Sequence, residues 1–256
     1  MANALASYFL SLGGRIETNF TVSSLEQLPS SHAVMLDITP KQLLQIAGHK
    51  LSSFYSWQMK RFRYGPGVFK IDWALDSPIP FIAEGCRQAG TVHIGNTFEE
   101  IAETEKNTWN GKHADRPFVL LAQQSLFDDS RAPRGKHTAW AYCHVPSGST
   151  KDMTEQIENQ VERFAPGFRE RVLGRHVMNS SDLEMYNPNN IGGDIGGGVQ
   201  DIGQLFTRPA LRFSPYRTSA KGIYLCSSST APGGGVHGMC GYHAAKKALK
   251  DIFEIH

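Results

Sequence analysis

Alternation of hydrophobic and polar residues along the middle of the chain predicts the strands of a half-buried sheet. In residues 67–75 (GVFKIDWAL), apolar side chains at every second position share one side and two charged side chains share the other. This period of two is typical of a strand with one buried face. Shorter apolar or alternating runs predict further strands. These lie at residues 15–22, 33–38, 91–96, 118–125, 136–145 and 222–226, and residues 171–184 are expected to be extended.

Helices are predicted where apolar residues recur every three or four positions. In residues 151–164 this stripe consists of Ile157, Val161 and Phe164. Further helices are expected at 1–12, 41–47 and 51–61, from Thr97 (with Glu100 three residues later, typical of a capping box), and at 237–254. Because strands and helices do not alternate regularly, the predicted fold class is α+β with a mixed, largely antiparallel sheet.

Composition narrows the class of protein. With 256 residues, 40% of them hydrophobic and 20% charged, the chain is typical of a soluble globular protein with a substantial core. A formal net charge of +2 and the lack of a long Lys/Arg run argue against a nucleic-acid partner. Four scattered cysteines without C-x-x-C spacing favour reduced thiols and a cytoplasmic location. No apolar run reaches the roughly 18 residues of a transmembrane helix, and the first residues lack the basic start of a signal peptide.

A glycine-rich turn near the C-terminus is the most informative motif. Gly233, Gly235 and Gly238 satisfy G-x-G-x-x-G between a predicted strand and a predicted helix. Glycines let the backbone approach a ligand closely, and a helix N-terminus attracts phosphate. A complete dinucleotide site needs a second strand and an acidic residue about 20 positions further on, and the chain ends before that point. The turn is therefore either a partial cofactor contact or a plain connection between strand and helix.

Other residues with chemical potential also have structural interpretations. His237, Cys240 and His243 do not have the spacing of a zinc site. Trp140 and Tyr142 share one strand face, so they line an apolar substrate cleft or, as we favour, belong to the core. The Gly- and Asn-rich segment 187–201 is expected to be a functional or disordered loop. His137 and His144 are expected to be surface or satisfied-core histidines. For Arg208 and Arg217, surface or loop-anchoring roles are favoured over substrate binding. No arrangement predicts nucleophilic or paired-carboxylate catalysis, so no catalytic residue is assigned.

The segment GIYLCSSSTAPGGGVHGMCGYHAAKKAL (222–249) resembles the C-terminal flavin-contacting segment of the phytoene desaturase-like FAD oxidoreductases. This group includes carotenoid desaturases and isomerases, retinol saturases and pyridine nucleotide-disulfide oxidoreductase-like proteins. Further segments resemble the family in order along nearly the whole chain. They are SLGGRIETNFTVSSL (11–25), AVMLDITP (33–40), VFKIDWALDSPIPF (68–81), HTAWAYCHVP (137–146), NPNNIGGDIGGG (187–198), RPALR (208–212) and SPYRT (214–218).

The resemblance implies three parts: residues 1–40 return to the FAD domain, 41–210 form the substrate-binding region, and 211–256 form the flavin-contacting strand and helix of an incomplete Rossmann-like FAD-binding domain. It also implies that FAD makes a second, late contact with the turn. The residues concerned are Ser227, Ser228, Pro232, Gly233, Gly234, Gly235, Val236, His237 and Gly238. The family's N-terminal fingerprint for the ADP half of FAD has no counterpart before residue 11, and Ser227 stands where relatives commonly have Gly. We therefore expect this chain alone to bind FAD weakly or not at all.

Two hypotheses about function follow. In the first, the chain is the C-terminal part of an FAD-dependent desaturase, saturase or isomerase that acts on an apolar, isoprenoid-like small molecule. Its partner is then a complementary N-terminal FAD-binding half, or the chain self-associates, and attachment to a membrane surface is left open. In the alternative, the chain is a truncated, non-enzymatic domain that binds a hydrophobic ligand or a partner without flavin.

Overall fold

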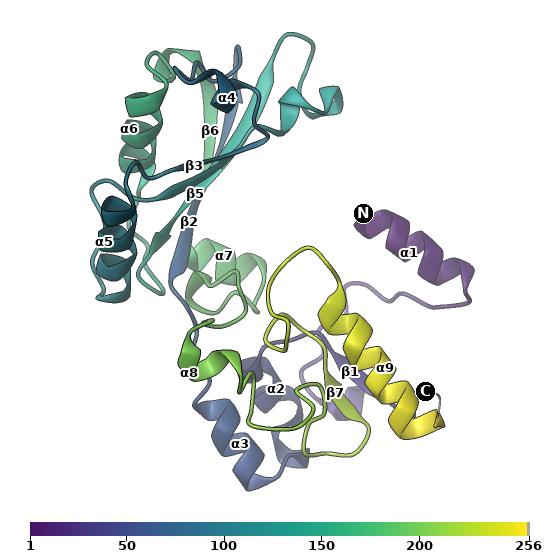
Figure 1. Ribbon diagram of the computed structural model, residues 1–256. Coiled ribbons are helices and arrows are strands. Elements are labelled where there is room, and N and C mark those ends of the chain that lie inside the picture. Colours follow the sequence, from purple (N-terminus) through teal and green to yellow (C-terminus); the bar gives the residue numbers. More distant parts are fainter. Residues whose placement is uncertain (255–256) are drawn as a thin grey trace.

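The computed structural model describes residues 1–254, which form two lobes, each with its own hydrophobic cluster (Figure 1). Residues 67–178 form the upper lobe, and the segments before and after them meet in the lower lobe. The mixed architecture, with an antiparallel sheet, helices and a separate strand–helix unit, confirms the predicted fold class.

The upper lobe contains a five-stranded antiparallel sheet in the order β3-β4-β5-β2-β6. Its strands are β2 (Gly67–Leu75), β3 (Thr91–Ile94), β4 (Val119–Ala122), β5 (His137–Val145) and β6 (Val172–Met178). In β2 the apolar side chains predicted to share a face, among them Ile71 and Trp73, are buried in the core. Helix α6 (Thr154–Phe164) covers this face with Ile157 and Val161.

Two short helices complete the upper lobe. Helix α5 (Phe98–Trp109) begins as predicted, because the Thr97 side chain accepts a hydrogen bond from the Glu100 N–H. Its Glu100 also pairs with Arg163 of α6, which ties the two helices together. Helix α4 (Glu84–Arg87) is a single turn.

The lower lobe is built around a parallel pair of strands that are far apart in the sequence. Strands β1 (Val34–Leu36) and β7 (Ile223–Leu225) pair in register, and three helices pack around them: α2 (Pro40–Ala47), α3 (Ser53–Lys60) and α9 (Met239–Phe253). Residues 216–218 line the other edge of β7 through an antiparallel bridge between Arg217 and Tyr224. No described residue pairs with the outer edge of β1.

Two predicted extended segments differ from the structure. Residues 15–22 form no strand, because no described strand lies beside them to accept and donate the ladder hydrogen bonds that a strand needs. The second half of 171–184 is helix α7 (Ser180–Tyr186). There the Asn179 side chain accepts hydrogen bonds from two backbone N–H groups, and the Asp182 side chain accepts one from the Asn179 N–H. This capping box stabilises the start of a helix where the sequence pattern predicted an extended chain.

The remaining helices are short or isolated. Helix α1 (Ala2–Ser11) forms as predicted but buries none of its residues and lies apart from both lobes in Figure 1. Helix α8 is Ile202–Leu205. Short 3-10 turns occur at Leu25–Gln27, Gly48–Lys50, Gln124–Leu126, Asp129–Arg131, Arg169–Arg171 and Ile191–Gly193. The three-part functional division of the chain at residues 40 and 210 stays a prediction. In the structure, α2 and α3 pack with β1 and β7 in one hydrophobic cluster.

Candidate functional site

The glycine-rich turn lies between β7 and α9, and two contacts on its buried side fix it to the lower lobe. The Tyr216 hydroxyl donates to the carbonyl oxygen of Ala231 at 3.0 Å. The buried Cys240 thiol lies 3.4 Å from the carbonyl oxygen of Gly233. Both contacts fix the first half of the turn to the lower lobe, while residues 234–238 stay exposed.

The exposed half of the turn presents a row of free backbone donors. Within residues 1–254, no protein acceptor is found for the N–H groups of residues 234–238. Gly238 has a left-handed conformation (φ +65°) and is the N-cap of α9, which has no acidic residue in its first turn. Free N–H groups near the positive end of a helix dipole attract an anion, although the first N–H of α9, that of Met239, already donates to His237. The turn is therefore chemically suited to a phosphate group.

The individual predicted contact residues fall into two groups. Ser227 is buried: its hydroxyl donates to the Ile38 carbonyl at 2.7 Å and accepts the Ser229 N–H at 3.2 Å, so it joins the turn to β1. Gly233 is also buried. Ser228 is half-buried, and the exposed remainder consists of Pro232, Gly234, Gly235, Val236, His237 and Gly238. The contact of these residues with a cofactor stays a prediction.

A second glycine-rich loop supports the turn from the side. A Cβ atom placed on Gly197 would lie 2.2 Å from the Ser228 hydroxyl, and one on Gly234 would lie 3.4 Å from the carbonyl oxygen of Gly196. The predicted loop at 187–201 is thus ordered against the 227–238 turn. Gly197 needs to be glycine because the two loops touch there and because its φ is +69°.

Arg208 is the residue that joins these two loops. It is 3% exposed, and its guanidinium donates to the carbonyl oxygens of residues 196–199 and of Ser228. Burial lowers the pKa of this guanidinium, and the neighbouring Asp194 carboxylate opposes that effect. For Arg208 the sequence left surface, loop-anchoring and substrate-binding roles open, and these contacts with two loops show loop anchoring.

Asp194 is a buried residue that sequence reasoning missed. Its carboxylate accepts the N–H groups of Gly65 and Gly196 at 2.7 Å and of Gly198 at 2.9 Å. The sequence did contain a hint, because Asp194 is the one acidic residue among the glycines of 192–198. A carboxylate in such a loop can accept hydrogen bonds from several backbone N–H groups. Asp194 and Arg208 together give the loop its shape.

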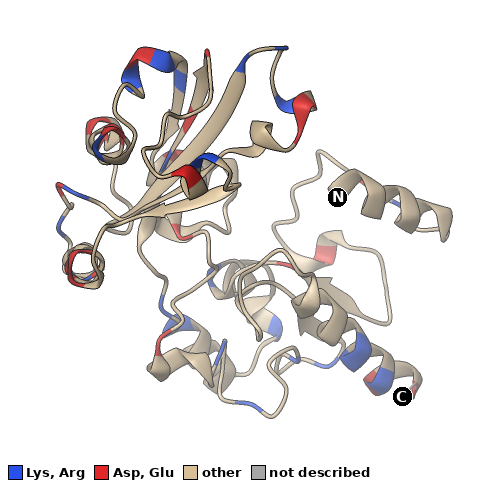
Figure 2. Cartoon of the chain, turned by 45° about the horizontal axis from the view of Figure 1, so that its top comes forward, with Lys and Arg blue, Asp and Glu red and all other residues tan. Residues whose placement is uncertain are grey.

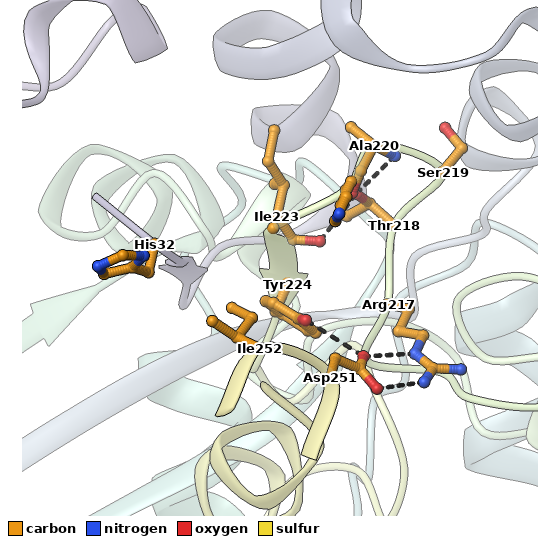
Figure 3. A pocket seen from close by; sticks show the side chains of 11 residues that line it. His32, Arg217, Thr218, Ser219, Ala220, Ile223, Tyr224, Asp251 and Ile252 are labelled. Carbon is orange, nitrogen blue, oxygen red and sulfur yellow. Dashed lines mark hydrogen bonds and ion pairs between the residues drawn. The ribbon is translucent and has the colours of Figure 1, made fainter. Parts of the chain in front are cut away.

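The hollow drawn in Figure 3 lies elsewhere, near the C-terminal end of α9. There the Asp251 carboxylate accepts two hydrogen bonds from Arg217 and one from the Tyr224 hydroxyl, and His32 lies on the opposite side (Figure 3). The Arg217 hydrogen bonds are the main reason why the pKa of Asp251 is lowered. This network ties α9 to the segment beside β7 and is separate from the glycine-rich turn.

One expectation from the sequence, a core position for the two aromatic residues on β5, is wrong. Trp140 and Tyr142 do not belong to the core: they lie on the face of β5 opposite the buried alanines and are half-buried. Their rings stack nearly parallel, with centroids 6.2 Å apart, and the ammonium group of Lys70 lies 5.9 Å from the Trp140 ring. Flat aromatic surface is thus available on this face.

Three of the histidines have hydrogen-bond partners, and two of the four free cysteines have burial-shifted thiols. His144 pairs with Glu105 at 2.9 Å, and His137 lies 3.2 Å from the Ser125 hydroxyl. His237 accepts the N–H of Met239. No group of metal-binding side chains occurs in the part of the chain that the structure describes. Burial raises the pKa values of Cys143 and Cys226 to about 12, so both thiols stay protonated at neutral pH.

Comparison with known proteins gives partial matches. No family model matches the sequence. The pyridine nucleotide-disulfide oxidoreductase domain-containing protein 2 of Rattus norvegicus is 35% identical over 154 residues, which are 56% of this chain and 26% of the relative. The 4,4'-diapolycopen-4-al dehydrogenase of Metabacillus indicus is 29% identical over 127 residues, 47% of this chain and 25% of that protein. The chain thus spans about a quarter of the length of these relatives.

Among solved structures, an oxidoreductase from Methanosarcina mazei matches 99% of this chain and 53% of its own, with a TM-score of 0.61 and 15% identity. This likeness establishes the fold. The chain therefore has the fold of part of an oxidoreductase. This structural likeness and the two sequence relatives together confirm the resemblance to the phytoene desaturase-like and pyridine nucleotide-disulfide oxidoreductase-like proteins. No helix among residues 1–254 combines the length and apolarity needed to cross a membrane.

Proposed function

We propose that this chain supplies the substrate-facing sheet and the cofactor-closing turn of an FAD-dependent oxidoreductase. The observation that carries the proposal is the row of free N–H groups at 234–238, beside a left-handed Gly238 and the N-terminus of α9. These residues fit a phosphate or ribityl group at Gly234, where there is no side chain and a Cβ atom would meet only the backbone of Gly196, whereas the His237 ring lies over Gly235. The isoalloxazine ring of bound FAD would take up or return the hydride.

The nucleotide half of the cofactor needs a second polypeptide segment. Val34 and Leu36 direct their peptide groups at β7, since the Val34 N–H donates to Gly222 and the Leu36 carbonyl accepts from Cys226. In a parallel pair the peptide groups of Met35 then point away, toward the outer edge of β1. A nucleotide-binding β–α–β segment would add its strand there. The unpaired residues 15–22 and the unpacked helix α1 would also gain neighbours from it.

The substrate would be an apolar small molecule. The stacked rings of Trp140 and Tyr142 form a flat, half-buried surface on β5, beside the charged pair Lys70 and Asp72 of β2, and a planar hydrocarbon would stack on these rings. The name of the Metabacillus indicus relative, a 4,4'-diapolycopen-4-al dehydrogenase, supports an isoprenoid-like compound.

The test compares flavin binding by two glycine variants of the protein assembled with its nucleotide-binding segment. Gly234 is exposed and does not need a left-handed φ, so Gly234→Val leaves the fold intact while its side chain blocks the free donors. We expect it to lose flavin. A Cβ atom on Gly48 would meet nothing within 4 Å, so Gly48→Ala is the matched control and should keep flavin. Flavin retention by a folded Gly234→Val variant would show that the turn is not a cofactor contact. An assembled protein that stays colourless throughout would favour the non-enzymatic alternative, a domain that binds a hydrophobic ligand or partner.

A further inference from the structure

Three adjacent hollows on the lower lobe share residues and form one continuous surface. The first lies between α3 and residues 211–213, and it shares Gln58 and Leu211 with the second. It shares Phe213 and Ser214 with the third, which extends to α9. We call this surface the basic aromatic face. Its defining residues are Phe54, Trp57, Arg61, Leu211, Arg212, Phe213, Lys246 and Lys250.

Large apolar side chains project from this face into solvent. Phe213 is fully exposed, and Leu211 and Phe54 are 75% and 68% exposed. The Phe54 ring stacks on the half-exposed Trp57 ring at a centroid distance of 5.8 Å, and the Arg61 guanidinium lies 5.0 Å from the Trp57 ring. Apolar side chains of this size gathered on one surface are uncommon and mark an interaction site.

The charge on the same face is positive and largely uncompensated. No Asp or Glu among the described residues lines the three hollows. Three cations that line the hollows are paired, Arg63 with Asp201 and both Arg217 and Lys247 with Asp251. Within residues 1–254, no ion pair is found for the four remaining cations, which are Arg61, Arg212, Lys246 and Lys250. Figure 2 shows the resulting predominance of blue along the bottom of this lobe.

The basic aromatic face is separate from the edge proposed to receive the nucleotide-binding segment. That edge belongs to β1, whereas the outer edge of β7 is occupied by residues 216–218. Arg217 and Tyr216 line the first and third hollows, so the face lies beyond this covering segment. Assembly along β1 therefore leaves the face exposed.

We propose that the basic aromatic face binds an anionic lipid bilayer surface. Aromatic and aliphatic side chains insert at the level of the headgroups, and surrounding Lys and Arg side chains attract anionic lipids. Here Leu211 and Phe213 alternate with Arg212 in a single loop, and Lys246 and Lys250 lie beside it on α9. Nucleic acid is less suitable because its phosphates follow a continuous stripe of cations, whereas these cations are separated by protruding apolar side chains.

The test is cosedimentation of the full chain with vesicles of phosphatidylcholine alone or mixed with phosphatidylserine. We expect binding to the mixed vesicles that weakens as salt is raised, and weak binding to neutral ones. Lys246→Gln with Lys250→Gln should weaken binding about 25-fold, since each cation near an anionic surface changes partitioning by about five-fold. Leu211→Ser with Phe213→Ser should weaken it even at low salt. The matched controls are the exposed Phe98→Ser and Lys136→Gln on the upper lobe, which should bind like the unaltered chain.

Three results would overturn the proposal. One is no binding to either vesicle; another is equal binding to neutral and anionic vesicles. The third is loss of binding in the control variants to the same degree as in the face variants. A parallel incubation with polyglutamate separates lipid from an acidic protein partner. Tight binding to polyglutamate that the Leu211→Ser/Phe213→Ser variant keeps, without vesicle binding, would assign the face to an acidic polypeptide.

Discussion

The guanidinium of Arg208 donates two hydrogen bonds to the carbonyl oxygen of Ser228, from Nη2 at 2.8 Å and from Nε at 3.2 Å. The same group donates to the glycine-rich loop at 196–199. One buried side chain therefore sets the distance between the loop and the turn that carries the free N–H groups. We regard Arg208 as a positioning residue for the proposed cofactor contact, since it donates hydrogen bonds to the carbonyl oxygen of Ser228 on the buried side of the turn.

Replacement of Arg208 by Lys should destabilise the protein markedly. An ammonium group cannot reproduce the planar fork of donors, so several buried carbonyl oxygens lose their partners. We expect a loss of about 3 kcal/mol in the free energy of unfolding, measured by urea denaturation. Arg134→Lys, at an exposed position for which no side-chain partner is found within residues 1–254, is the control and should change stability by less than about 0.5 kcal/mol. Near-wild-type stability of Arg208→Lys would contradict the anchoring role.

The link between Arg217 and Asp251 should make part of the stability depend on pH. The folded pKa of Asp251 lies below its usual value of 3.8, chiefly because Arg217 donates hydrogen bonds to it. The stabilisation is thus present above that usual value and is lost as the pH falls through the lower folded pKa. Asp251→Asn should cost about 1 kcal/mol at neutral pH, because the pair is partly exposed.

The measurement for this pair is urea denaturation at neutral pH and again in acid. The difference between Asp251→Asn and the unaltered chain should shrink in acid, where Asp251 itself becomes protonated. Asp129→Asn, at an exposed position that forms no ion pair with any described residue, serves as control and should show little difference at either pH. An equally large cost of Asp251→Asn at both pH values would mean that packing, and not charge, is responsible.

The thiols of Cys143 and Cys226 should resist alkylation in the folded protein. Burial raises both pKa values to about 12, so only about one thiol in ten thousand is ionised at pH 8. Iodoacetamide labelling followed by mass spectrometry should show both residues unmodified until urea unfolds the chain. Rapid labelling of Cys226 in the native protein would indicate that the β7–turn region opens readily.

The isolated chain should self-associate or expose apolar surface. Leu249 on α9 is 41% exposed and Met35 at the β1 edge is 37% exposed, while Leu5 and Phe9 of α1 are 69% and 49% exposed. Open strand edges and apolar patches favour association. Light scattering at micromolar concentration, with a dye that reports apolar surface, is the measurement. A stable monomer that binds no dye would remove the argument for a missing neighbour.

Much of the fold could be predicted because local patterns and burial agree. The alternation in 67–75 gave β2 with the bounds that the structure shows, and the Thr97–Glu100 pair located the start of α5. Residues 15–22 show the limit of this reasoning: their pattern suits a strand, but a strand also needs a neighbour. Glu158 shows a second limit of this reasoning. Its carboxylate can be buried because Trp73 and Arg175 donate hydrogen bonds to it, and the helical pattern of the sequence does not reveal these partners.

The candidate site could be located from sequence only in part. The glycine spacing at 233–238 marked the turn, because glycine and a helix N-terminus have direct consequences for backbone geometry. The support of the turn by Arg208 and Asp194 depends on contacts between loops that are separate in the sequence. Likewise, the alternation of β5 placed Trp140 and Tyr142 on one face but did not say which face α6 would cover.

The most direct test of the account is the flavin content of two purified proteins: the 256-residue chain alone, and the same chain extended through the reading frame upstream of Met1. After gel filtration with FAD, the visible absorption band of flavin is measured in each. We predict that the chain alone is colourless and that the extended protein, with a G-x-G-x-x-G segment, retains near-equimolar FAD. Submicromolar FAD affinity of the 256-residue chain alone, or a colourless extended protein that contains this segment, would contradict the account.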